Sequence, residues 1–145
     1  MKNVIALFIL TIGLSYGSAV FAQDQSFSNG SVWQIGFIKT GANMQTDYLN
    51  SLKSNWKATH DEAVKQGLIL SYKILSGASA NPGDWDIMLM TEYKSLAAME
   101  ASEDKWETIS KKVIGGEEAM KKLNEMRVDM RSIYGGKLMR EVIYK

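Results

Sequence analysis

The sequence predicts an α+β domain in which a four-stranded antiparallel sheet carries helices on one face. Three observations lead to this fold class. Short segments rich in branched and aromatic residues alternate with longer segments whose apolar residues recur with a helical period. Glycine and proline separate these segments. The segments follow the order strand, helix, strand, strand, helix pair, strand, which places two helical regions among four strands.

The first half of the domain predicts a strand, a helix and a second strand. Ser31–Lys39 is dense in aromatic and branched residues, which is typical of a strand. Asp47–Gln66 has a helical apolar stripe, with Thr46 or Asp47 as its N-cap, and Gly67 ends it. Ile69–Leu75 is the second predicted strand.

The second half predicts a strand, two helices and a last strand. The loop Gly77–Asp84 contains the only proline and joins two antiparallel strands, and Gly115–Gly116 separates the two helices. In chain order, the expected elements are Asp86–Tyr93, a helical region capped by Ser95, a helix over Glu117–Tyr134 and a strand over Leu138–Tyr144.

This order is that of the split βαβ, or ferredoxin-like, arrangement βαββαβ, with an extended second helical region. The predicted strands are apolar on both sides. In the first strand Trp33 and Phe37 point one way, while Val32 and Ile38 point the other way. Helices can cover only one face, and the other would expose a larger apolar patch than monomers usually carry. We therefore expect a homodimer formed through the helix-free face of the sheet.

The N-terminus has the features of a secretory signal peptide over Met1–Ala22. Lys2 precedes an apolar run that is too short to span a bilayer, and Val20-Phe21-Ala22 fits a cleavage site. We expect a flexible lead-in over Gln23–Gly30 and a single domain over Ser31–Lys145. The mature protein would then be periplasmic or extracellular, with no membrane association after cleavage.

Composition narrows the function classes. The chain has no cysteine and one histidine, so neither disulfides nor a zinc site is expected. Its 17 basic and 16 acidic residues nearly balance, whereas a nucleic-acid-binding protein normally carries a basic surface. There is no glycine-rich phosphate loop or dinucleotide motif, and we expect no cofactor.

The element order and two segments resemble the dimeric α+β barrel superfamily. The segments are the Trp56–Val64 half of the first helix and Asp84–Glu100 (DWDIMLMTEYKSLAAME), where a strand leads directly into a capped helix. The superfamily includes the antibiotic-biosynthesis monooxygenase group, the stress-responsive barrel proteins and small secreted bacterial proteins without assigned function. The resemblance covers about residues 31–145. It implies two ferredoxin-like subunits packed sheet to sheet, with a pocket beside or inside the barrel.

His60 and Tyr72 are the candidate catalytic residues. His60 lies on the apolar stripe of the first helix, one turn after Trp56, where it would be a general base facing a pocket or a hydrogen-bonded histidine at the edge of the core. Haem-degrading members of the superfamily use an asparagine, a tryptophan and a histidine. Asn43, Trp56 and His60 are of these types, but two of them lie close together on one helix, which favours coincidence.

The candidate ligand-binding residues are Trp33, Trp56, Glu92 and Arg140. Glu92 and Arg140 are polar positions inside apolar strands, and they would either form a salt bridge at the dimer interface or orient a ligand. Arg127 and Arg131 are expected on a solvated helix face with local ion pairs.

Three functional hypotheses follow. The first is an exported homodimer that binds a small apolar or aromatic molecule. The second is a cofactor-independent oxygenase or isomerase that uses His60 for proton transfer. The third is a structural or partner-binding dimer without catalysis. These hypotheses leave open whether the protein is an enzyme.

Overall fold

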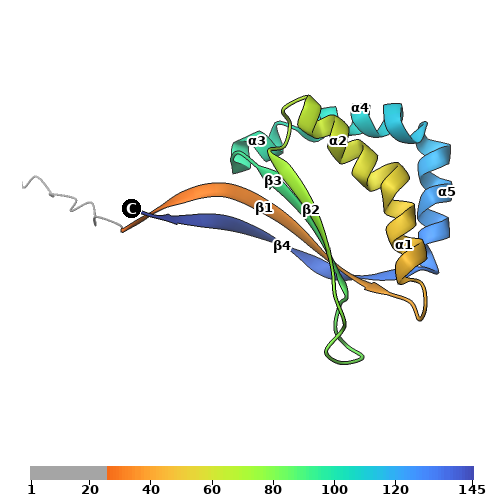
Figure 1. Ribbon diagram of the computed structural model, residues 1–145. Coiled ribbons are helices and arrows are strands. Elements are labelled where there is room, and N and C mark those ends of the chain that lie inside the picture. The colour runs from red at the N-terminus through yellow and green to blue at the C-terminus, as the bar shows by residue number, and fades with distance from the viewer. Residues whose placement is uncertain (1–25) are drawn as a thin grey trace, which may run out of the picture.

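The computed structural model describes residues 26–145, and the predicted signal peptide and the start of the lead-in lie outside this range (Figure 1). Four strands and a series of helices make up the domain. In chain order they are β1 (Phe27–Thr40), α1 (Gln45–Leu52), the π-helical turn η1 (Lys53–Lys57), α2 (Ala58–Lys65), β2 (Ser71–Ser76), β3 (Ile87–Tyr93), α3 (Leu96–Glu100), α4 (Glu103–Ile114), α5 (Glu117–Val128) and β4 (Arg131–Tyr144).

The predicted ferredoxin-like fold is confirmed by the strand order. The four strands form one antiparallel sheet in the order β2-β3-β1-β4, so each helical region connects strands that are not direct neighbours in the sheet. The helices pack on one face and over one end of the sheet, and β1 and β4 continue past them as a two-stranded ribbon (Figure 1).

Two boundaries differ from the prediction, and both differences lengthen the β1–β4 pair. β1 begins at Phe27, so Phe27–Gly30 belongs to the strand and not to the lead-in. α5 ends at Val128, and β4 begins at Arg131 and not at Leu138. The spacing of Met130 and Ile133 fits the stripe of α5, but the pairing of Ile133 with Ile38 takes this segment into the sheet.

The predicted first helix is present, with a π-helical turn in its middle. α1, η1 and α2 run on without a break, and Gly67 ends the last one with a φ of 69°, a left-handed conformation that suits glycine. The N-cap is Met44, without a side-chain hydrogen bond, and not Thr46 or Asp47. The predicted cap at Ser95 is confirmed, since its hydroxyl accepts from the Ala98 N–H at 3.1 Å.

Two apolar clusters hold the helices to the sheet. In the first, Val32 and Tyr93 pack with Ala63 of α2 and Ile109 of α4. The second lies at the other end of the first helix and is built from Ile38, Tyr48, Leu52 and Ile87. Tyr93 belongs to the first cluster and Trp56 packs against the second, and both residues line the groove that lies between the sheet and the helices.

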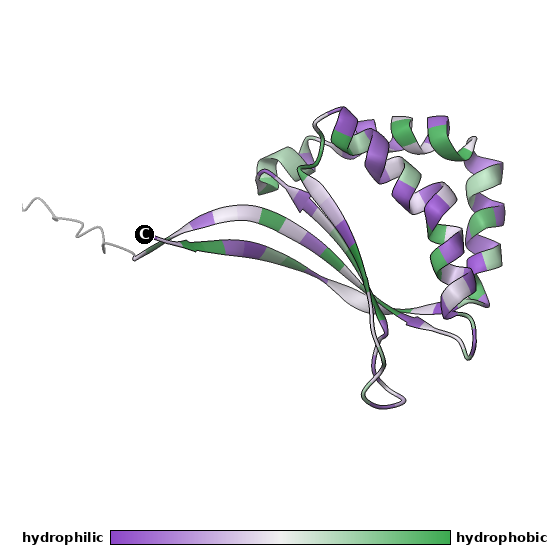
Figure 2. Cartoon of the chain, in the orientation of Figure 1, coloured by the Kyte–Doolittle hydropathy of each residue, from purple (hydrophilic) through white to green (hydrophobic). Residues whose placement is uncertain are grey.

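The helix layer leaves β4 uncovered. Every residue of this strand after Arg131 is exposed, although the strand pairs with β1 along most of its length. Figure 2 shows hydrophobic positions along β1 and β4, including the stretch that the helices do not reach. The exposed apolar residues of the strand are Ile133, Tyr134, Leu138, Met139, Val142, Ile143 and Tyr144.

The helix-free face of the sheet has an apolar centre with charged neighbours. Strand pairing places Met90 beside Ile35, Met88 beside Phe37, and Trp33 beside Met139. Lys73 and Lys137 lie at the two ends of the row through Met90 and Ile35, and Glu92 lies between Ser71 and Trp33 in another row. Among the helices in the described part of the chain, none is both long enough and apolar enough to cross a bilayer.

Candidate functional site

A groove of about 850 Å³ lies between the sheet and the helices. β4, which forms one edge of the sheet, contributes to the lining of this groove. Its wall on the helix side is formed by Trp56, His60, Met99 and Trp106, and the strands contribute Gln34, Ile35, Gly36, Leu89, Thr91, Tyr93, Ile133, Gly135, Gly136, Lys137 and Leu138. Predominantly apolar and aromatic walls with a few polar groups are typical of small-molecule sites.

His60 is the central polar residue of the groove, and its tautomer follows from its two hydrogen bonds. The Nδ1 atom lies 2.7 Å from the carbonyl oxygen of Trp56, which can only accept, so Nδ1 carries the proton. The Nε2 atom lies 2.9 Å from the Thr91 hydroxyl and therefore accepts its hydrogen. Both ring nitrogens are thus occupied, and the lone pairs of the Thr91 oxygen are left for a ligand donor.

Aromatic rings surround the imidazole. The Trp56 ring stacks on it with centroids 3.6 Å apart, the Trp106 ring is tilted at 4.9 Å, and the Tyr72 ring meets it edge-on at 5.4 Å. The stack arises because Trp56 and His60 are four residues apart on one continuous helix.

Burial keeps His60 neutral. Only 7% of the residue is exposed, and this burial lowers the pKa of its imidazole to about 4, against the opposing effects of the Trp56 carbonyl and Asp61. A histidine with such a pKa is uncharged at neutral pH and is a weak base. The arrangement is suited to orienting a bound molecule through Thr91, and less suited to removing a proton from it.

A second polar group lies toward the α4 end of the groove. The Trp106 indole N–H donates to the Tyr93 hydroxyl at 3.1 Å, and that hydroxyl in turn lies 3.5 Å from the Gln34 side-chain oxygen. Burial raises the pKa of Tyr93, so its hydroxyl stays protonated and remains a hydrogen-bond donor. Gln34 is exposed in the groove, where its amide is available to a ligand.

Two paired glycines make room at the floor of the groove. Gly36 of β1 is opposite Gly136 of β4 and next to Leu89 of β3. A Cβ atom at Gly36 would meet only the Leu89 carbonyl oxygen, at 4.0 Å, so the space above it is open. A Cβ atom at Gly136 would lie 2.9 Å from the Ile35 carbonyl oxygen, which excludes side chains there.

The structure brings together some of the residues predicted from the sequence and separates others. His60, Tyr72 and Trp56 lie together, but the Tyr72 hydroxyl points away from the imidazole and donates to Asp61 at 2.5 Å. Trp33 and Glu92 face each other across β1 and β3 on the helix-free face of the sheet.

There the Lys73 ammonium lies 5.3 Å from the Trp33 ring centre, and the Ser71 hydroxyl donates to Glu92 at 2.5 Å. Arg140 is exposed on β4, beside Val32 and outside the groove lining. Asn43 occupies the turn before α1, also outside that lining.

Sequence reasoning did not identify Thr91, Tyr93, Trp106 or the glycine pair as site residues. The signal for Thr91 was present, since it is the one aliphatic hydroxyl residue in the alternating series Ile87, Leu89, Thr91, Tyr93. Gly36 and Gly136 are 100 residues apart in the sequence, and only the strand register brings them opposite each other.

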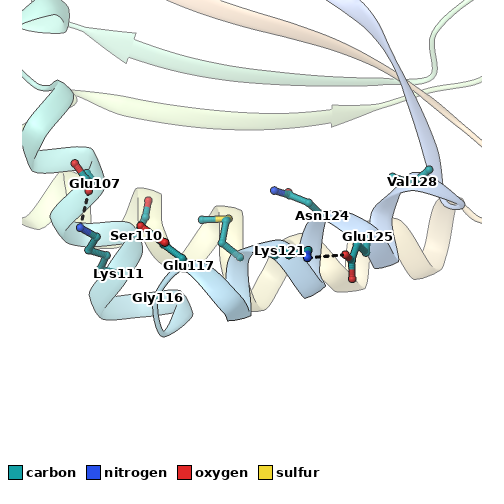
Figure 3. Close-up of a pocket in the computed structure, with 10 residues that line it drawn as sticks. Glu107, Ser110, Lys111, Gly116, Glu117, Lys121, Asn124, Glu125 and Val128 are labelled. Carbon is teal, nitrogen blue, oxygen red and sulfur yellow. Dashed lines mark ion pairs between the residues drawn. The ribbon is translucent and has the colours of Figure 1, made fainter.

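A second hollow of about 530 Å³ lies between α4 and α5 (Figure 3). Its walls include two exposed ion pairs, Lys111 with Glu107 at 2.5 Å and Lys121 with Glu125 at 4.0 Å. Met120 and Val128 add apolar surface, but no buried polar side chain faces the hollow. We therefore place the candidate site in the groove beside His60. Within residues 26–145 no three His, Cys, Asp or Glu side chains cluster as metal ligands would.

No protein-family model and no curated protein matches this sequence. Several solved structures are similar to it in fold. HapK from Hahella chejuensis is 13% identical with a TM-score of 0.43, and the match covers 76% of this chain and 91% of HapK. A dimeric ferredoxin-like protein from an uncultured marine organism is 16% identical with a TM-score of 0.47, over 81% of this chain and 90% of that one.

A dimeric protein of unknown function with a ferredoxin-like fold, from Bacteroides fragilis, is 14% identical with a TM-score of 0.38. That match covers 80% of this chain and 97% of the other. The ferredoxin-like assignment of this chain itself rests on its own strand order and antiparallel pairing.

Proposed function

We propose that this chain is an exported homodimer that binds a small apolar or aromatic molecule in the groove beside His60. The observation that carries the proposal is the groove itself. Its volume of about 850 Å³ is within the range of small-molecule sites, and stacked aromatic side chains line it around a few fixed polar groups.

Binding is favoured over catalysis by the hydrogen bonds of His60. An oxygenase or isomerase of the cofactor-independent kind would need a base that can take a proton from the substrate. Here both nitrogens of His60 are engaged and burial lowers its pKa to about 4. The polar atoms that remain available, on Thr91 and Gln34, give a ligand its orientation.

The ligand proposal is tested by filling the groove from its floor. N-phenyl-1-naphthylamine, a neutral apolar fluorophore, is titrated into wild-type protein and into Gly36→Leu. Because a side chain at Gly36 enters open space without a backbone clash, we expect the variant to fold and to lose at least tenfold in affinity for the fluorophore.

Gly77→Leu is the matched control, because a Cβ atom there meets nothing within 4 Å and the residue lies in the exposed loop after β2. We expect this variant to bind like the wild type. Absence of fluorophore binding by the wild type, or equal binding by a well-folded Gly36→Leu variant, would contradict the groove as a ligand site and favour a purely structural dimer.

The dimer is supported by the apolar helix-free face, and two neighbouring residues of β4 allow a direct test. Leu138 is 51% exposed and lines the groove, while Met139 is 52% exposed and lies on the other face beside Trp33. Met139→Glu would place an unpaired charge in the proposed interface, so we expect it to shift the protein toward monomer in sedimentation experiments.

Leu138→Glu has the same change in charge on the groove face. We expect it to weaken fluorophore binding and to leave the sedimentation coefficient unchanged. If both variants, or neither, became monomeric, the assignment of the interface to the helix-free face would be wrong.

Export is tested separately. When the full chain is expressed in a bacterium that secretes proteins, N-terminal sequencing of the periplasmic fraction is expected to start at Gln23. Recovery of the uncleaved chain from the cytoplasm alone would contradict the proposal that the protein is exported.

A further inference from the structure

Two of the three arginines of the chain lie close together at the junction of α5 and β4. Arg127 is in the last turn of α5 and Arg131 is the first residue of β4, while Arg140 is farther along that strand. The sequence predicted a solvated helix face for the first two. In the structure both are half-buried, and α5 ends between them.

Buried polar residues of the first helix hold the two guanidinium groups. The Arg127 Nη2 atom donates to the side-chain oxygen of Asn55, which is buried in η1. The Arg131 guanidinium carbon lies 5.7 Å from the ring centre of Tyr48, a fully buried residue of α1. Asn55 itself is fixed, since its oxygen also accepts from the Trp56 N–H at 2.5 Å and its amide nitrogen donates to the Ser51 carbonyl.

The charge of this cluster is not balanced by the protein. Over residues 26–145, no carboxylate lies within 4.0 Å of either guanidinium. The Nε–H groups of Arg127 and Arg131 are both enclosed and have no acceptor. Burial lowers the pKa of Arg127, and the charge of Arg131 lowers it further, although the nearby Tyr48 opposes this. Enclosed charged donors without partners are costly, so native proteins usually pair them.

From the unpaired guanidinium groups held by Asn55 and Tyr48, we propose that Arg127 and Arg131 bind an oxyanion: a carboxylate, phosphate or sulfate group. A guanidinium presents parallel N–H donors that match two oxygens of such a group, and a bound anion would offset the repulsion between the two cations.

The place of the cluster leaves two sources for the oxyanion. Asn55 is next to Trp56, and Arg131 is two residues before Ile133, and both Trp56 and Ile133 line the groove. The oxyanion is therefore either a free ion or the acidic group of a molecule that occupies the groove. The site itself follows from the arginine pair and does not depend on the proposed function.

The side-chain Nε–H signals of arginine give a direct test by NMR. The chain has three such signals, and Arg140, exposed on β4, is an internal control. Sodium phosphate is titrated at constant ionic strength against sodium chloride, with Arg127→Lys and Arg131→Lys used for assignment. We expect the Arg127 and Arg131 signals to shift and saturate together, while Arg140 shows only a small linear drift.

A second arm separates the two sources by using 1-naphthoate on the wild type and on Gly36→Leu. If the oxyanion belongs to a groove ligand, naphthoate binds the wild type at least tenfold more tightly than phosphate, and Gly36→Leu removes that advantage. If it is a free ion, Gly36→Leu has no effect on either probe. Both results support the oxyanion site.

Replacing one guanidinium group of the arginine pair should weaken its affinity for the oxyanion. Arg131→Lys keeps the charge but loses the paired donors of the guanidinium. We therefore expect the dissociation constant for the oxyanion, measured at the remaining Arg127 signal, to rise at least tenfold. The proposal would be overturned if neither probe gave a saturable shift at Arg127 and Arg131, or if Arg140 shifted equally. Neutral N-phenyl-1-naphthylamine should bind Arg131→Lys like the wild type, so a failure here is distinguishable from a failure of the proposed function.

Discussion

β3 and β4 pair with the same strand, β1, from its two sides, yet they lie in opposite environments. The helices cover β3, and its residues facing them are buried or line the groove. β4 is twice as long, carries seven exposed apolar residues, and is exposed after its first residue. The difference indicates that the helix layer is matched to only part of the sheet. In our proposal, the groove ligand and the partner subunit cover the remaining part of the sheet.

The sharpest way to test this contrast uses two isoleucines that flank Ile38. Ile87 on β3 is 0% exposed and Ile133 on β4 is 66% exposed, and both pair directly with Ile38. Ile87→Ala should lower the free energy of unfolding by about 4 kcal/mol, because it leaves a cavity in the core, and Ile133→Ala by less than about 1 kcal/mol. Urea denaturation measures both. Equal losses would mean that β4 is as well packed as β3.

The buried histidine on the covered side of the sheet predicts that the stability of the protein depends on pH. The folded-state pKa of His60 is about 4, against 6.5 for the free side chain, so between these values the unfolded state binds more protons. The stability that the folded protein gains by keeping His60 uncharged is present in full above pH 6.5. As the pH falls toward 4, the free energy of unfolding decreases by about 3 kcal/mol in total.

Urea denaturation at pH 7 and pH 4 checks this, with His60→Gln as the control. Between pH 7 and pH 4, the free energy of unfolding of the variant should fall by about 3 kcal/mol less than that of the wild type. A wild type and variant with parallel pH profiles would show that His60 is not buried in its neutral form.

The smallest expected effect compares the removal of one hydroxyl group from β3 with the removal of one from β4. Thr91→Val leaves the His60 Nε2 atom without its donor and should cost about 1.5 kcal/mol. Ser132→Ala removes an exposed hydroxyl from β4 and should change the stability by less than about 0.5 kcal/mol.

Thr91→Val should also raise the pKa of His60, because the hydrogen bond to its neutral form is lost. NMR titration of the imidazole signals measures this shift. An unchanged pKa would indicate that the Thr91 hydroxyl does not donate to Nε2.

Much of the fold could be predicted from the sequence because it depends on local patterns. The alternation in Ser31–Lys39 places Trp33 and Phe37 opposite Val32 and Ile38, and the Ser95 cap and the Gly67 end are local features. The end of α5 was predicted wrongly for a physical reason. Met130 and Ile133 continue the helical spacing, and only pairing with the distant β1 makes Ile133 part of a strand.

The site could be predicted only in part. The proximity of Trp56 and His60 follows from their spacing on one helix, as the stacked rings show. The hydrogen bond between His60 and Thr91 depends on how that helix lies over β3, which no local pattern records. Trp33 and Glu92 were predicted as ligand-binding residues together with Trp56, but the strand register places them on the face of the sheet that the helices do not cover.

The π-helical turn η1 has a consequence for how the first helix presents its side chains. A π turn holds one more residue than an α turn, and each residue of an α-helix advances by about 100° around the axis. Deleting a single residue from Lys53–Lys57 would therefore let this segment form an ordinary α turn, and α2 would keep its orientation relative to α1. Asn55 now faces α5 while His60 faces β3, and a regular helix with the same composition would turn one of them away from its partner.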